Sequence, residues 1–141
     1  MKPPTEAQLK EEVNDGYGLH LEGEPSWLIQ TEIDLKEAEL DALELTAEMV
    51  TDRWEKEEKY LLSMIRSYEL SLEFELEWQD EVDPIAVARE QEKLQEARNK
   101  YAKEKEEYKD GKKKSDEAVG LKKRELAVLR DILRRSHVGH F

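Results

Sequence analysis

The chain has 141 residues, of which 41% are charged and 38% hydrophobic, and its net charge is −12. Soluble domains typically hold about 25% charged and roughly 45–50% apolar residues, so a thick globular core would be hard to fill here. The length suits one domain, and the absence of cysteine excludes disulfides and thiol chemistry. With only six Gly and four Pro, the composition predicts an all-α fold.

The charge is unevenly distributed along the chain. Residues 1–90 carry 8 Lys/Arg against 25 Asp/Glu, a balance of −17, whereas residues 91–141 carry 15 against 10, a balance of +5. Such a chain either neutralises itself by packing its two halves side by side, or offers an acidic part and a basic part to different partners. The sequence leaves both readings open.

No targeting or membrane segment is recognisable. The first residues, MKPPTEAQLKEE, lack the apolar stretch of a signal peptide, and no uncharged apolar run approaches the roughly 20 residues that a membrane span needs. We therefore expect a protein of the cytoplasm or of the interior of a viral particle.

Residues 1–25 are predicted to form a short helix followed by an extended arm. Thr5 and Gln8 have the spacing of a capping box, and Gly16 suits a helix end, which places the short helix at about 6–14. Residues 17–25 contain two Gly and one Pro, and apolar residues alternate in the first five of them, so we expect a connecting segment in extended form.

The next segment, 26–82, is predicted to be the first arm of a helical hairpin. It lacks Gly and Pro, and its apolar residues recur in steps of four and three, the pattern of a coiled coil that needs a partner helix. Lys36 and Glu57 interrupt this seam. The seam residues are Ile29, Ile33, Leu40, Leu43, Ala47, Val50, Trp54, Leu61, Met64 and Tyr68.

A second arm is predicted at 84–136, followed by a tail at 137–141. Asp83 is a suitable N-cap, and Pro84 suits the first helical position because its missing N–H would have no partner there. Near-heptad apolar residues continue through this arm: Leu94, Ala97, Tyr101, Tyr108, Ala118, Leu126, Leu129, Ile132 and Leu133. The two arms are nearly equal in length, which predicts a long antiparallel, coiled-coil-like hairpin, 26–136.

Folding the chain about residue 83 predicts a register. It places Trp78 near Val87, Leu61 near Lys105, Leu40 near Leu126 and Ile33 near Leu133. The same register sets Glu55, Glu57 and Glu58 beside the basic run Lys109–Lys114, so exposed ion pairs would hold this part of the hairpin. Each such pair contributes roughly 0–1 kcal/mol.

The second arm has one alternative reading. Asp110-Gly111, with Ser115 as a cap, could break it at 110–115 and give a third helix.

Residues 69–78 combine two patterns. Leu70, Leu72, Phe74, Leu76 and Trp78 alternate with polar residues, as in a half-buried strand that could pair with Tyr17–Leu21. Because Leu and Glu favour helix and β-branched residues are absent, helix is the preferred prediction. On a helix these residues form two stripes, one with Leu70, Phe74 and Trp78 and one with Ile65, Leu72 and Leu76. A hairpin partner covers only one of them.

Catalytic and metal-binding patterns are absent from the sequence. Pairs such as Glu73 and Glu77 are expected on any solvated acidic helix, and no phosphate-binding or hydrolase motif occurs. His137 and His140 lie three apart, but a Gly separates them and no Cys is near. We expect no enzyme activity, no cofactor, no metal site and no small-molecule substrate.

The basic residues of the second arm suggest two uses. They could contact nucleic-acid phosphates, or they could neutralise the acidic first arm and the helix C-terminus. A net charge of −12 favours neutralisation, so nucleic-acid binding by residues 109–135 is a third hypothesis. The basic contact surface would comprise Lys112, Lys113, Lys114, Lys122, Lys123, Arg124, Arg130, Arg134 and Arg135.

More apolar residues gather near the turn than one antiparallel helix can cover, which predicts a protein interface there. Its expected residues are Ile65, Leu70, Leu72, Phe74, Leu76, Trp78, Ile85 and Val87. The leading hypothesis is a structural or assembly protein that self-associates or docks on a larger assembly. The acidic helical layout with a basic C-terminal helix is similar to that of viral scaffolding and virion accessory proteins. The alternative is an acidic inhibitor that occupies a basic nucleic-acid-binding groove of another protein.

Overall fold

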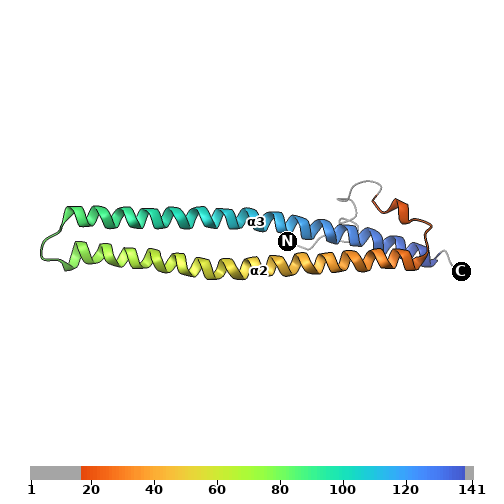
Figure 1. Ribbon diagram of the computed structural model, residues 1–141. Helices are drawn as coiled ribbons and strands as arrows, with labels where there is room; N and C mark the ends of the chain where they lie inside the picture. Colours follow the sequence, from red (N-terminus) through yellow and green to blue (C-terminus); the bar gives the residue numbers. More distant parts are fainter. Residues whose placement is uncertain (1–16, 139–141) are drawn as a thin grey trace. The chain divides into compact units, whose positions relative to one another are not determined.

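The computed structural model describes residues 17–138, and for residues 137 and 138 the backbone alone (Figure 1). Two long helices, α2 and α3, pack against each other in antiparallel orientation, and no strand occurs in the described range. The predicted all-α helical hairpin is therefore confirmed, whereas the predicted helix 6–14 and most of the tail lie outside the described residues. The elements are the 3₁₀ turn η1 (Leu19–Leu21), α2 (Ser26–Glu73), the π-helical turn η2 (Phe74–Trp78) and α3 (Pro84–Val138).

The first long helix ends in an unusual way. α2 passes at Glu73 into the wider π-helical turn η2, and Gln79 then takes an extended conformation with φ −91° and ψ 143°. Residues 69–78 are thus helical, as preferred, and the strand alternative is wrong. Its proposed partner is also missing, because Leu19–Leu21 form a 3₁₀ turn and offer no strand edge.

The start of α3 follows the predicted cap. The Asp83 carboxylate accepts a hydrogen bond from the Ile85 N–H at 3.0 Å, and the Asp83 carbonyl accepts one from the Val87 N–H at 3.0 Å. The helix then continues without interruption through Gly111, so the break at 110–115 is wrong. A single glycine destabilises a helix by about 1 kcal/mol. Lys and Glu, which are frequent in this part of α3, favour helix strongly enough to offset that cost.

The described residues divide into two compact units. Unit 1 contains residues 17–48 and 113–138, and unit 2 contains residues 49–112. Unit 1 holds a cluster of six buried apolar side chains: Leu21, Ile29, Ile33, Leu126, Leu129 and Ile132. All of them except Leu21 lie at predicted seam positions. Leu21 is the addition, contributed by the connecting segment.

That connecting segment is folded, not extended. Gly18 has a positive φ of 80°, its carbonyl accepts a hydrogen bond from the Leu21 N–H at 2.9 Å, and Leu21 is buried in the cluster. The apolar alternation of residues 17–21 therefore arises from a turn that covers the core of unit 1. The extended reading of this part of the arm is wrong because the burial of Leu21 favours a tight turn over a straight chain.

Replacing Gly18 by alanine should destabilise unit 1. The new Cβ would lie 2.8 Å from Ile132 Cδ1, and the positive φ adds backbone strain, so we expect a loss of about 1–3 kcal/mol. Gly23→Ala is the matched control, because Gly23 has a φ of 84° with no atom within 4 Å of the added Cβ, and it should lose only about 1 kcal/mol. Urea unfolding measures both. Equal losses would show that the contact with Ile132 adds nothing.

Unit 2 is held by aromatic side chains as well as by buried leucines. Leu61 and Leu94 are buried, and Trp54 stacks on Tyr108 and Tyr101 with ring centroids 5.3 Å and 6.4 Å apart. The Tyr101 hydroxyl donates a hydrogen bond to Glu58 at 2.9 Å. The predicted arrangement, in which glutamates 55–58 face Lys109–Lys114, is therefore wrong for Glu58.

The predicted register is displaced by about one helical turn. Folding about residue 83 would place Trp54 opposite Lys112 and Glu39 opposite Ala127, whereas Trp54 stacks on Tyr108 and Glu39 pairs with Lys122. The turn occupies Gln79–Asp83, so its centre precedes Asp83. Two of the predicted pairings still fall in the same part of unit 1, because Ile33 and Leu126 belong to the buried cluster and Leu40 and Leu133 pack against it.

Candidate protein interface

Six large apolar side chains of unit 2 are exposed around the turn, each by 46–72% of its surface. We call this set the turn surface: Leu70, Phe74, Leu76, Trp78, Val82 and Ile85. Trp78 and Ile85 are the most exposed, at 72% and 71%. Such a concentration of exposed apolar side chains in a chain that is 41% charged needs an explanation.

Four short stretches of backbone position the turn surface. Leu70 lies in the last turn of α2, three members lie on η2, Val82 lies in the loop, and Ile85 lies in the first turn of α3. The π-helical turn widens the helix where Phe74, Leu76 and Trp78 project, and π-helical turns are frequent at functional sites. Both predicted stripes have exposed members, so α3 covers neither stripe completely.

Five of the eight predicted interface residues are among the exposed residues, and three are half-buried: Ile65, Leu72 and Val87. Val82 was not predicted, because the prediction considered apolar stripes on helices. This residue is the single apolar side chain in the loop 79–83. Its position between Glu81 and Asp83 is a weak signal that could have found it.

The turn surface lies in the most acidic part of unit 2. Residues 67–92 contain nine Asp/Glu and one basic residue, Arg89. The exposed acidic residues nearest the turn are Glu73, Glu77, Asp80, Glu81 and Asp83. Apolar side chains and negative charge therefore occur together there.

Several residues of the predicted basic surface pair with the acidic first arm. Lys122 lies 2.6 Å from Glu39, and Arg130 lies 3.0 Å from Glu37. Lys123 pairs with Glu44 of the first arm at 4.0 Å, whereas Arg135 pairs with Glu22 of the connecting segment at 3.2 Å and Arg134 pairs with Asp131 of its own helix at 3.5 Å. Arg124 is half-buried and also has a partner, while residues 112–114 are exposed. Much of the positive charge in unit 1 is thus used within the hairpin.

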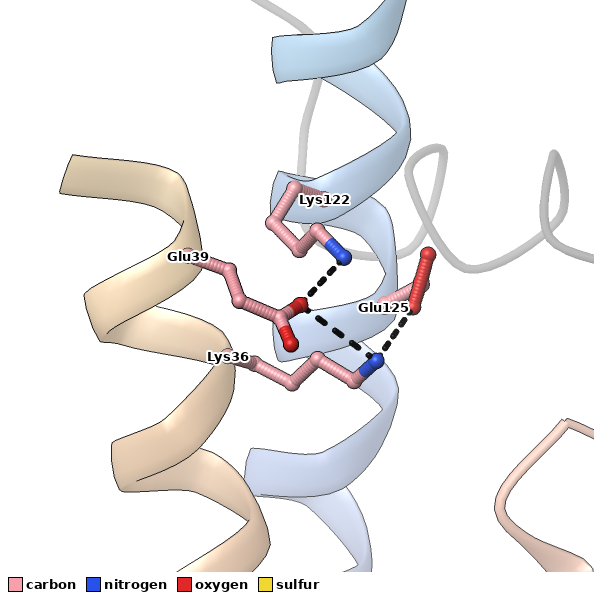
Figure 2. Close-up of polar contacts among 4 residues, drawn as sticks. All are labelled: Lys36, Glu39, Lys122 and Glu125. Atoms are coloured by element: carbon pink, nitrogen blue, oxygen red, sulfur yellow. Dashed lines mark hydrogen bonds and ion pairs between the residues drawn. The ribbon is translucent and has the colours of Figure 1, made fainter. Parts of the chain in front are cut away.

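A ladder of four alternating charges explains how Lys36 can occupy a seam position. Figure 2 shows Lys36 and Glu39 of α2 reaching toward Lys122 and Glu125 of α3. The Lys36 ammonium lies 3.4 Å from Glu125 and 3.7 Å from Glu39, and its side chain is only 18% exposed. The ladder neutralises the charge of Lys36 and links α2 to α3 in unit 1.

Within this ladder the hydrogen bond between Glu39 and Lys122 shifts the pKa values of both groups. The hydrogen bond from Lys122 lowers the pKa of the Glu39 carboxyl, and the same bond raises the pKa of the Lys122 ammonium. Burial, followed by the negative charge of Glu125 and a hydrogen bond to it, raises the pKa of Tyr17 well above its usual range. Tyr17 also packs against the buried cluster of unit 1.

The lowered pKa of Glu39 predicts an acid-dependent contribution to stability. Because the pKa is lower in the folded chain than its ordinary 4.5, the ionised form favours folding above that pH, and the gain is lost as pH falls below it. Glu39→Gln removes the titrating group, so wild type should be more stable than the variant at about pH 7, with the difference shrinking toward about pH 3. Urea unfolding at both pH values measures it. A difference that stays constant would contradict this assignment.

Two pockets occur at other places on the described chain. One, of about 610 Å³, is lined by residues 22–26 together with Ile132, Arg135 and Ser136 in unit 1. The other, of about 460 Å³, lies beside Trp54 and Tyr108 in unit 2.

Within residues 17–138 no cluster of His, Cys, Asp or Glu could hold a metal ion. His140 and the side chain of His137 lie outside the described part.

Within the same range no helix has both the length and the apolar character to cross a membrane.

Comparisons of the chain with protein-family models, with curated proteins and with solved structures find no significant match.

Proposed function

We propose that the chain is a non-enzymatic assembly protein that docks on another protein through the turn surface. The observation that carries the proposal is the exposure of six large apolar side chains around one turn, although the chain has few apolar residues to fill its own core. Hydration of apolar surface is unfavourable by about 25 cal/mol per Å², so covering this surface stabilises a complex.

The identity of the side chains supports an interface. Trp is among the residues that most often dominate binding energy, and Phe74 lies one helical turn from Trp78. Together with Ile85 these residues offer apolar anchors of different shape, while Asp83 holds the start of α3 through its cap. A capped and helical scaffold reduces the entropy lost on binding.

Charge indicates what kind of partner fits. Two copies of the turn surface facing each other would bring together two groups of nine acidic residues, each with one arginine, and like charges across an interface are unfavourable. We therefore infer a different protein, whose apolar groove carries Lys or Arg at its rim. Self-association through two turn surfaces is the less favourable form of the proposal.

The acidity of residues 67–92 also favours a second candidate function, the occupation of a basic nucleic-acid-binding groove. The two candidates differ in what they need. Mimicry depends on carboxylates and weakens steeply with salt, whereas apolar docking depends on Phe74 and Trp78 and weakens little. Binding measured at about 50 mM and about 500 mM salt separates them.

Photo-crosslinking tests the proposal directly. A photoreactive residue at position 78 should form a covalent product with a second protein, whereas the same residue at position 60 should not, although Tyr60 is also 57% exposed. The captured protein, once purified, should bind the wild-type chain in a calorimetric titration. Equal products from both positions, or a captured protein that does not bind in titration, would contradict docking at the turn.

A further inference from the structure

A second row of exposed side chains runs along α2 in unit 1. Its members are separated by steps of four, four, three, four and three residues, and all six are exposed: Trp27, Thr31, Leu35, Ala38, Ala42 and Leu45. We call them the outer stripe. The exposed fractions of Trp27, Leu35 and Leu45 are 69%, 52% and 58%. Spacing of this kind is that of a helix seam that meets another helix.

The outer stripe is distinct from the hairpin seam. Successive residues of an α-helix are rotated by about 100°, which places Leu35, Ala38 and Ala42 on the side of α2 roughly opposite to Ile33 and Leu40. Those two seam residues belong to, or pack against, the buried cluster of unit 1. The single helix α2 therefore has two apolar faces, and α3 covers one of them.

The composition of the outer stripe suits close packing by a helix. Ala38 and Ala42 are small enough to let a second helix approach, while Leu35 and Leu45 project on either side of them. The Thr31 hydroxyl already donates to the Trp27 carbonyl at 2.8 Å, so its polar group needs no further partner. Isolated exposed leucines are common and need no explanation, but a regular row of six positions does.

The charges beside the outer stripe indicate its occupant. Asp34, Asp41 and Glu48 are exposed and seven residues apart, which places them along one edge of the stripe, as in the flanking positions of a coiled coil. Residues 27–48 contain seven Asp/Glu and one basic residue, Lys36, which faces Glu125 of α3. The edge is acidic, so a fitting helix carries Lys or Arg opposite it.

We propose that the outer stripe binds a basic amphipathic helix of another protein, with small and aliphatic residues at its seam and Lys or Arg at seven-residue spacing beside it. A second copy of the stripe fits poorly, because it has the same acidic edge. Residues 1–16 also fit poorly, since they contain four acidic and two basic residues. The basic stretch 109–135 of a second copy has its main apolar residues, Leu126, Leu129 and Ile132, already buried.

A designed peptide tests this proposal independently of the turn surface. The probe is a fluorescein-labelled helix of about 22 residues with Leu and Ala at its seam and Lys at its flanking positions, and the control peptide carries Glu in place of each Lys. In fluorescence anisotropy at about 100 mM salt, the full chain should bind the Lys peptide with a dissociation constant in the micromolar range and the Glu peptide at least about tenfold more weakly.

Two variants locate the binding. Leu35→Ser with Leu45→Ser should weaken binding of the Lys peptide about tenfold or more, whereas the matched control, Leu19→Ser with Leu62→Ser, should not, although its two leucines are 60% and 45% exposed. A charge swap, Asp34→Lys with Asp41→Lys, should reverse the preference so that the Glu peptide binds better. Far-UV circular dichroism checks that each variant keeps its helix content.

Three results would overturn the proposal. The first is failure of wild type to bind the Lys peptide below about 1 mM. The second is equal weakening by the stripe variant and by its control. The third is self-association of wild type in sedimentation equilibrium that is lost in the stripe variant, because the occupant would then be a second copy of the chain.

Discussion

Replacing Leu129 by alanine is expected to lower the free energy of unfolding by about 2–5 kcal/mol. Leu129 has no exposed surface and lies in the buried cluster of unit 1. Truncation of this side chain removes buried apolar surface and leaves a cavity. Because unit 1 has few other buried side chains, little can move in to fill that cavity. Urea unfolding followed by circular dichroism measures the loss.

The control for this substitution is Leu121→Ala, on the same helix and in the same unit. Leu121 is 44% exposed, so its truncation should change the free energy of unfolding by less than about 0.5 kcal/mol. If both variants lost the same stability, the cluster around Leu129 would not be the core of unit 1.

The combined substitution Phe74→Ala with Trp78→Ala should have the largest effect on binding. Truncation of dominant interface residues costs about 2 kcal/mol or more each, so the affinity for the protein captured at position 78 should fall at least about 100-fold. The helix content should hardly change, because the two side chains are 51% and 72% exposed and contribute little to folding. Calorimetric titration and circular dichroism of the same preparation measure the two effects.

Tyr60→Ala with Leu62→Ala is the matched control for binding. Both residues lie on α2 in unit 2 and are 57% and 45% exposed, but neither belongs to the turn surface. This variant should keep the affinity of wild type. If the two double variants weakened binding equally, the effect would come from general loss of apolar surface and not from the turn.

The sequence was most informative where one physical signal dominated. The repeat of apolar residues in steps of four and three identified Ile29, Ile33 and Leu129 as core residues, because burial against a partner helix selects that spacing. The pair Asp83-Pro84 located the start of α3, since a side-chain acceptor and a residue without an N–H both suit a helix N-terminus.

Other features are not encoded in the spacing of the apolar residues. The π-helical turn η2 is a local change of helix geometry, and no residue type in Phe74–Trp78 requires it. The observed register differs from the predicted one because the chain reverses direction through a loop of several residues. The prediction assumed a reversal at a single residue, Asp83. The stack of Trp54 on Tyr101 and Tyr108 followed from that shift.

The candidate sites were predictable to different degrees. The turn surface followed from counting apolar residues near Asp83, with Val82 missed because it lies outside the helices. The outer stripe was not predicted, because α2 is rich in Leu and Ala on several sides and the spacing does not show which side remains exposed. Exposure in the folded chain separates residues that α3 covers, such as Leu40, from those it leaves uncovered, such as Leu45.

Hydrogen exchange of the full chain with and without the captured partner tests the central claim most directly. Docking through the turn surface predicts that backbone amides of residues 70–85 exchange more slowly in the complex, while those of residues 50–60 exchange at the same rate in both samples. Slower exchange confined to other parts of the chain, with unchanged rates at 70–85, would contradict docking at the turn.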